Sequence, residues 1–246
     1  MNGEKTMASV PQRRRSGGFT ILEMSVVLVV IALIIGAVSV GRDVYRSAVA
    51  ERISTEFVQG WIIAYDRYVA QVGTVPLDDL ANPSGRVRNG STDPLCDTTS
   101  SKDLRNEMLK RGITLPTGRA EGMESHYVYQ DSTGQPQEVQ VCFTSVTDWA
   151  EPGTGSTYVP RTRNVMVLRG LTPELANQLD NRIDGRVDAR FGRLREATPG
   201  SVQYSLTSAI GTPPTANPWS LDETQTRGGR PDDQVQTMVA YLKMNQ

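Results

Sequence analysis

The stretch Gly17-Gly18-Phe19-Thr20-Ile21-Leu22-Glu23 joins a basic leader to a long apolar run. No residue from Met24 to Gly41 carries a formal charge, and as an α-helix this run would rise about 27 Å, close to the thickness of a hydrocarbon core. Length and composition therefore predict a membrane-spanning helix. Glu23 lies just inside its edge, where a carboxylate is costly unless a cation or a proton compensates it. We therefore expect Glu23 to have a function and a positive partner.

The charges around the apolar run predict its orientation. Arg13, Arg14 and Arg15 precede it, so the positive-inside rule keeps the N-terminus in the cytoplasm and sends everything after Gly41 outward. An ordinary secretory signal is cut after its apolar region at a small-residue site, and the residues from Gly41 to Arg46 make a poor site of that kind. A plain signal anchor, with Glu23 at the headgroup boundary, is the alternative.

The sequence Gly-Phe-Thr-x-x-Glu, after a basic cluster and at the start of an uncharged run, resembles the N-terminus of type IV prepilins and of type II secretion pseudopilins. The resemblance implies that a prepilin peptidase cuts between Gly18 and Phe19 and then N-methylates Phe19. It also implies that Glu23 is the glutamate that neutralises the amino terminus of a neighbouring subunit during assembly. Residues 1–18 would be the leader peptide and residues 19–41 the transmembrane and filament-core helix.

Apolar residues continue at helical spacing beyond the membrane run, and they predict one helix from Phe19 to about Val72 that ends near Gly73. We expect residues 42–75 to pack on a head domain formed by residues 76–246. The helix contains no proline, so any kink would have to rely on a glycine. The apolar stripe comprises Tyr45, Val49, Ile53, Phe57, Trp61, Tyr65 and Tyr68, and the helix glycines are Gly36, Gly41 and Gly60.

The remaining pattern predicts an α+β fold, in which the long N-terminal helix packs on a small antiparallel sheet. Capping signals predict a helix that starts at Thr172-Pro173-Glu174. Residues 235–242 fit either a helix or a strand, and their β-branched content together with the resemblance favours a closing strand. Other expected elements are a helix at Lys102–Arg111, strands at Tyr127–Gln130, Glu138–Phe143, Asn164–Leu168 and Val202–Leu206, and an irregular loop from Gly211 to Asp233.

Two cysteines, Cys96 and Cys142, both fall on the outward side of the membrane, where an oxidising compartment favours a bridge. They lack CxxC spacing and no histidine is near them in the sequence, so a redox or metal-binding pair is the weaker interpretation. We therefore predict a structural disulfide between Cys96 and Cys142. It would tie a long connection to a strand of the sheet.

Three groups in the head raise rival functions. His126 is the only histidine, so a catalytic triad would depend on it alone. Asp180 and Asp184 match positions of a calcium loop, but Arg182 occupies a ligand position and the motif fails. A solvated, ion-paired helix face is the simpler interpretation of Asp180, Asp184 and Asp188. The interleaved arginines, which are Arg182, Arg186, Arg190, Arg193 and Arg195, could grip DNA, although the aspartates would dilute their field.

Removal of the leader, whose net charge is +3, would change the formal net charge from −1 to −4, and a mildly acidic head does not suggest a nucleic-acid platform. We interpret the chain as a pilin or minor pilin, held in the inner membrane and then assembled with other subunits into a periplasmic or extracellular filament. Its expected partners are prepilin peptidase, other pilin subunits and the inner membrane, with no catalysis, cofactor or metal of its own. The alternatives are a type II secretion pseudopilin and, from another class, a single-pass envelope enzyme or sensor.

Overall fold

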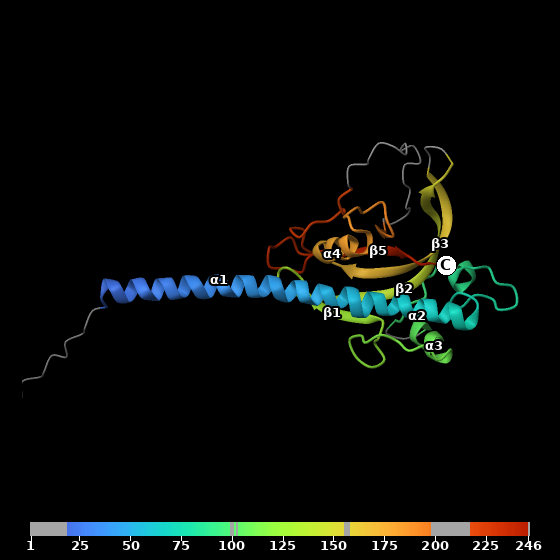
Figure 1. The fold of residues 1–246 in the computed structure, drawn as a ribbon, viewed down its shortest axis with the longest axis horizontal. Helices are drawn as coiled ribbons and strands as arrows, with labels where there is room; N and C mark the ends of the chain where they lie inside the picture. The colour runs from blue at the N-terminus through green and yellow to red at the C-terminus, as the bar shows by residue number, and fades with distance from the viewer. Residues whose placement is uncertain (1–18, 99–100, 102, 155–157, 198–216, 246) are drawn as a thin grey trace, which may run out of the picture. The chain divides into compact units, whose positions relative to one another are not determined.

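The computed structural model describes residues 19–98, 101, 103–154, 158–197 and 217–245 of the 246-residue chain (Figure 1). The chain divides into two compact units, residues 1–45 and residues 46–246. The expected leader at 1–18, which includes Gly18, and the expected strand at Val202–Leu206 lie outside the described residues. The expected irregular loop from Gly211 to Asp233 is described only from residue 217.

The long helix predicted from the apolar spacing is present, with a π-helical turn inside it. A π-turn accommodates one extra residue per turn without breaking the helix. A kink would have had to rely on Gly36, Gly41 or Gly60, and all three lie in regular α-helix, outside the π-helical turn. The helical segments are α1 (Ile21–Arg52), the π-turn η1 (Ile53–Val58) and α2 (Gln59–Val72).

The helix ends at the predicted position. Gly73 has a φ of 83°, a left-handed conformation that glycine adopts without the steric cost of a Cβ. Its N–H donates to the Val69 carbonyl at 2.9 Å, which satisfies one of the last helical carbonyls. The chain can therefore leave the helix directly and turn into the head.

In the part of the chain that the structure describes, five antiparallel strands form one sheet in the order β1-β2-β3-β5-β4. The predicted α+β fold is confirmed. The strand at residues 235–242 is also confirmed, as β5. β2 and β3 are longer than predicted, and β4 was not expected from the sequence. The bounds are β1 (His126–Gln130), β2 (Pro136–Pro152), β3 (Tyr158–Leu171), β4 (Leu194–Glu196) and β5 (Met238–Lys243).

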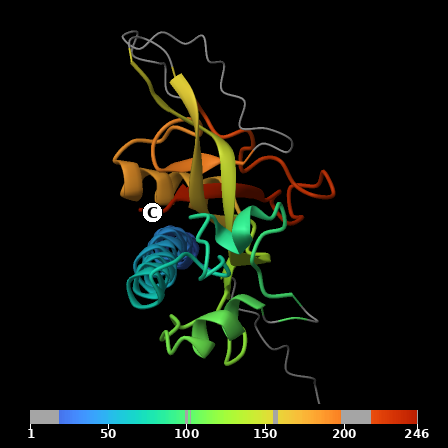
Figure 2. The ribbon, with the colours of Figure 1, turned by 90° about the vertical axis from the view of Figure 1, so that its right-hand side faces the viewer.

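The main core lies between α2 and one face of the sheet. Figure 2 looks along the helix and shows the strands beside it. Rings from both layers pack together, with centroids 6.2 Å apart for Trp61 and Phe143 and 5.0 Å apart for Tyr65 and Phe143. Burial of such rings dominates the stability of a core of this kind. The predicted stripe is buried from Ile53 to Tyr68, whereas Tyr45 is 61% exposed and does not belong to this core.

The described residues of the head also form the helices α3 (Asp103–Lys110) and α4 (Pro173–Asp184), together with a short 3-10 turn at Val87–Gly90. The start of α4 follows the prediction, since the Thr172 side chain accepts a hydrogen bond from the Leu175 N–H and Pro173 occupies the first turn. α3 is tied to α2 by the Tyr68 hydroxyl, which donates to Glu107 Oε1 at 2.6 Å. Burial, together with the hydrogen bond to Glu107, raises the pKa of Tyr68 to about 12.

Candidate functional site

The first turn of α1 is closed by two side chains that bond to each other, Thr20 and Glu23. The Thr20 N–H and hydroxyl donate to Glu23 Oε2 at 2.8 and 3.0 Å, and the Glu23 N–H donates to Thr20 Oγ1 at 3.2 Å. This reciprocal pattern is a capping box, in which a threonine and a glutamate three residues later satisfy N–H groups left free at a helix start. The sequence pattern led us to assign no separate role to Thr20, although Thr-x-x-Glu is a known signature of this box.

Beyond this turn, the helix surface is apolar and uncovered. Every residue from Phe19 to Tyr45 is exposed, and the first apolar side chains are among the most exposed, with Phe19 at 80% and Ile21 at 91%. A continuous apolar surface of this length is unfavourable in water and requires lipid or other helices around it. Among the described residues, one helical stretch, Ile21–Val72, is long and apolar enough to cross a membrane.

Residues 13–39 match the family described as the prokaryotic N-terminal methylation motif. The chain carries a class III signal. This signal marks type IV prepilins and pseudopilins, and the matched residues contain the basic cluster, Phe19, the Thr20–Glu23 box and most of the apolar run. A class III signal with a single apolar N-terminal helix fits anchoring in a membrane before assembly. No curated protein and no solved structure matches the chain.

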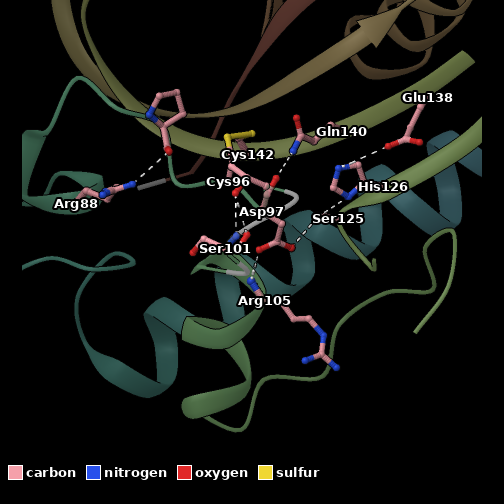
Figure 3. Close-up of a disulfide and its surroundings, with 12 residues drawn as sticks. Arg88, Cys96, Asp97, Ser101, Arg105, Ser125, His126, Glu138, Gln140 and Cys142 are labelled. Atoms are coloured by element: carbon pink, nitrogen blue, oxygen red, sulfur yellow. Dashed lines mark hydrogen bonds and ion pairs between the residues drawn. A yellow bond between two sulfur atoms is a disulfide. The ribbon is translucent and has the colours of Figure 1, made fainter. Parts of the chain in front are cut away.

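The family match ends at residue 39 and does not include the head. In the head, the two cysteines form a disulfide. It joins Cys96, in the loop before α3, to Cys142 on β2, with their Cα atoms 4.5 Å apart (Figure 3). Backbone pairing accompanies it, since Leu95 and Phe143 exchange hydrogen bonds of 2.7 and 3.0 Å. The disulfide therefore fixes a loop that the sheet also holds by main-chain bonds.

Asp97, the residue after Cys96, connects this loop to both β1 and α3. It is fully buried, and its carboxylate accepts hydrogen bonds from the Ser125 hydroxyl at 2.7 Å and the Arg105 N–H at 3.0 Å. The second bond satisfies an N–H near the start of α3, where the first N–H groups of a helix have no partner within the helix. The loop, the helix and the strand are therefore held by one carboxylate.

His126 lies beside this group. Its Nδ1 is 3.0 Å from the Ser125 hydroxyl and its Nε2 is 3.6 Å from Glu138 Oε1, so a carboxylate, an imidazole and a hydroxyl stand in the order of a catalytic triad. The order alone does not make a nucleophile. Ser125 is fully buried and its hydroxyl donates to Asp97, so its oxygen is out of reach of a substrate in this conformation. The group stabilises the loop around the disulfide.

The aspartates of α4 and its following loop bond to the backbone. Asp180 accepts the Asp188 N–H at 2.8 Å, and Asp184 accepts the N–H groups of Arg193 and Leu194 at 2.8 and 2.9 Å. The expected solvated face is wrong for Asp180 and Asp188, which are 0% and 2% exposed. Burial, with a smaller contribution from the nearby Asp184 carboxylate, raises the pKa of Asp180 to about 7. Among the described residues, no group of three acidic, histidine or cysteine side chains could hold a metal ion.

Three arginines of the same region have separate partners. Arg182 pairs with Glu51, and Arg186 pairs with Asp188 at 3.1 Å. Arg195 is buried, with its guanidinium 4.0 Å from the centre of the Trp149 ring and its Nη1 donating to the Ala150 carbonyl. These contacts direct the three side chains to different elements. They therefore do not line up as one basic stripe for phosphates.

Proposed function

We propose that this chain is a structural subunit, a pilin or minor pilin, of a type IV pilus-like filament. Prepilin peptidase would cut it between Gly18 and Phe19 and N-methylate Phe19, and the subunit would assemble through its N-terminal helix. The observation that carries the proposal is the class III signal at residues 13–39, placed at the start of a helix whose apolar surface is fully exposed. The α+β head joined to such a helix supports it.

Glu23 supplies the chemistry of assembly. Cleavage creates a positive amino terminus at Phe19, and the Glu23 carboxylate of one subunit would neutralise the terminus of its neighbour. Each charge is costly to bury in lipid or in a filament core when it is alone, and the pair removes both costs together. The carboxylate thereby favours the assembled state over any arrangement that leaves either charge unpaired.

The same proposal places the molecule in the cell envelope. Before assembly the N-terminus faces the cytoplasm and the apolar helix spans the inner membrane, in line with the three arginines that precede it. After assembly the helix exchanges lipid for neighbouring helices, and the head faces the periplasm or the exterior. The head itself performs no catalysis in this account. Its disulfide suits the oxidising side of the membrane.

Processing tests the proposal. The wild-type chain and a Gly18→Leu variant are expressed with and without prepilin peptidase, and the length of each product is read by gel mobility. We expect the peptidase to shorten the wild-type chain by the leader of residues 1–18 and to leave Gly18→Leu at full length. Gly17→Leu is the matched control, because it places the same bulk one residue before the cut. A Gly18→Leu chain cut as efficiently as the wild type would contradict the proposal.

A further inference from the structure

The two carboxylate oxygens of Glu23 have different surroundings. Both bonds from Thr20, one from its N–H and one from its hydroxyl, end on Oε2. Oε1 accepts no hydrogen bond from any residue in the described part of the chain. Glu23 is at the same time exposed at the start of an apolar helix. One oxygen is therefore bound within the subunit, and the other is open to a group from outside it.

We propose that Thr20 is a positioning residue for assembly, which binds one oxygen of Glu23 and presents the other to the positive amino terminus of the adjacent subunit. This inference rests on the proposed function and assigns a second residue to the same contact. Thr20 does not touch the partner's amine in this account. It acts through the carboxylate of Glu23.

The physical reason lies in the freedom of a glutamate side chain. An unrestrained Glu23 can rotate about three bonds, and ordering it when the neighbour arrives would cost conformational entropy. The capping box removes most of that freedom in advance, because Oε2 is already fixed by two donors. The hydroxyl makes two of the three bonds of this box, since it donates to Oε2 while it accepts the Glu23 N–H. Pre-ordering a group in its bound orientation favours association in this way.

A purely local role for Thr20 has a different signature. If the capping box did no more than stabilise the helix start, removal of the hydroxyl would have the same effect whatever charge stands at position 23. Glutamine separates the two roles, because it can complete a capping box as glutamate does but carries no charge. The effect of losing the Thr20 hydroxyl should therefore depend on the Glu23 charge only if Thr20 acts through it.

The experiment measures how much of each full-length variant enters filaments when it is co-expressed with the wild-type chain, relative to its own processed subunit in the membrane. The variants are Thr20→Val, Thr20→Ser, Glu23→Gln and the double variant Thr20→Val with Glu23→Gln. Ser25→Ala is the matched control, because the Ser25 hydroxyl bonds to the Leu22 carbonyl at 2.8 Å and not to Glu23.

We expect Thr20→Val to lower incorporation about fivefold, the order of effect that loss of one helix cap has on an equilibrium. Thr20→Ser, which keeps the hydroxyl, should restore incorporation to near the wild-type level, and Ser25→Ala should leave it unchanged. The double variant should match Glu23→Gln alone. The inference is overturned if Thr20→Val enters filaments normally, or if it lowers incorporation by the same factor in the Glu23→Gln background.

Failure of this inference and failure of the proposed function give different results. Normal incorporation of Glu23→Gln would overturn the charge pairing itself and the inference with it. Impaired incorporation of Glu23→Gln together with a normal Thr20→Val would overturn only the role of Thr20. Loss of peptidase cutting in Thr20→Val would also overturn it, because the inference places the effect of Thr20 after processing.

Discussion

The Ser125 hydroxyl donates a 2.7 Å hydrogen bond to the carboxylate of Asp97, so the residue next to Cys96 is held against the segment that enters β1. The same carboxylate accepts the Arg105 N–H of α3. The disulfide is therefore one part of a larger attachment between the loop, the helix and the sheet. Loss of the disulfide should therefore destabilise α3 as well as the loop that contains Cys96.

Replacement of Cys96 and Cys142 by serine should lower the free energy of unfolding. The bridge closes a loop of sequence separation 46, and chain entropy predicts a loss of about 4 kcal/mol for a loop of this size. Urea denaturation of the full chain in detergent, with the disulfide intact and in the double-serine variant, measures the difference. Amide exchange should also accelerate in α3. Unchanged stability and unchanged exchange would contradict the attachment described here.

The long helix could be predicted from the sequence because its apolar residues recur at helical spacing over many turns. The lengths of β2 and β3 could not, since they are set by pairing between distant residues, which continues to Pro152 opposite Tyr158. β4 is too short to show any periodicity. The burial of Asp180 could not be predicted either. Aspartates and arginines that alternate along a chain are typical of a solvated helix face, and only the folded structure shows that the following loop covers Asp180.

More of the N-terminal site than of the head could be predicted from the sequence. Glu23 could be recognised because a carboxylate inside an apolar run needs an explanation. Thr20 was missed for a physical reason: the proposed intersubunit role of Glu23 suggests a distant cation, whereas the structure gives the carboxylate a partner three residues away. The π-turn at Ile53–Val58 follows from no single residue type. It could not have been placed from the glycines.

Asp180 should make the head less stable as pH rises. Burial raises the pKa of Asp180 from 3.8 to about 7, so between these pH values the folded form keeps a proton that the unfolded form releases. The free energy of unfolding therefore falls as pH rises from about 4 to 7, by on the order of 2–4 kcal/mol. Asp180→Asn should remove this slope and be the more stable form at pH 8. The measurement is denaturation of the wild type and of Asp180→Asn at several pH values from 4 to 8. If the free energy of unfolding of the variant falls with pH as steeply as that of the wild type, Asp180 is not the cause.

Glu151 should have the opposite pH dependence. Arg163 donates to both of its oxygens at 2.8 and 2.6 Å, and Lys243 lies 3.1 Å away. The hydrogen bonds from Arg163, with the help of Lys243, lower the pKa of Glu151 to about 2. The stability from this group is present above about pH 4.5 and is lost as pH falls toward 2.

Glu151→Gln should therefore lower the free energy of unfolding by roughly 1–2 kcal/mol at pH 7, after allowance for partial exposure of Arg163. The difference in free energy of unfolding between this variant and the wild type should be smaller at pH 2. Glu121→Gln is the control, because Glu121 is exposed and forms no ion pair with a residue in the described ranges. A gap of equal size at both pH values would show that the charge of Glu151 is not the cause.

Glu23→Val should separate membrane insertion from assembly. The apolar run from Met24 to Gly41 is unchanged in this variant, so insertion should proceed, and removal of an acid from its edge should if anything favour it. Incorporation into filaments should fall by at least tenfold, because the neighbour's amino terminus is left without a counter-charge. Membrane fractionation followed by quantification of filament subunits measures both steps. Incorporation at the wild-type level would contradict charge pairing.

The most direct test of the account is the mass of the N-terminal peptide from the protein purified out of its native membrane or filament. We expect a chain that begins at Phe19 and carries a methyl group on its amino nitrogen, with residues 1–18 removed. A purified chain that still begins at Met1, in cells that contain an active prepilin peptidase, would contradict it.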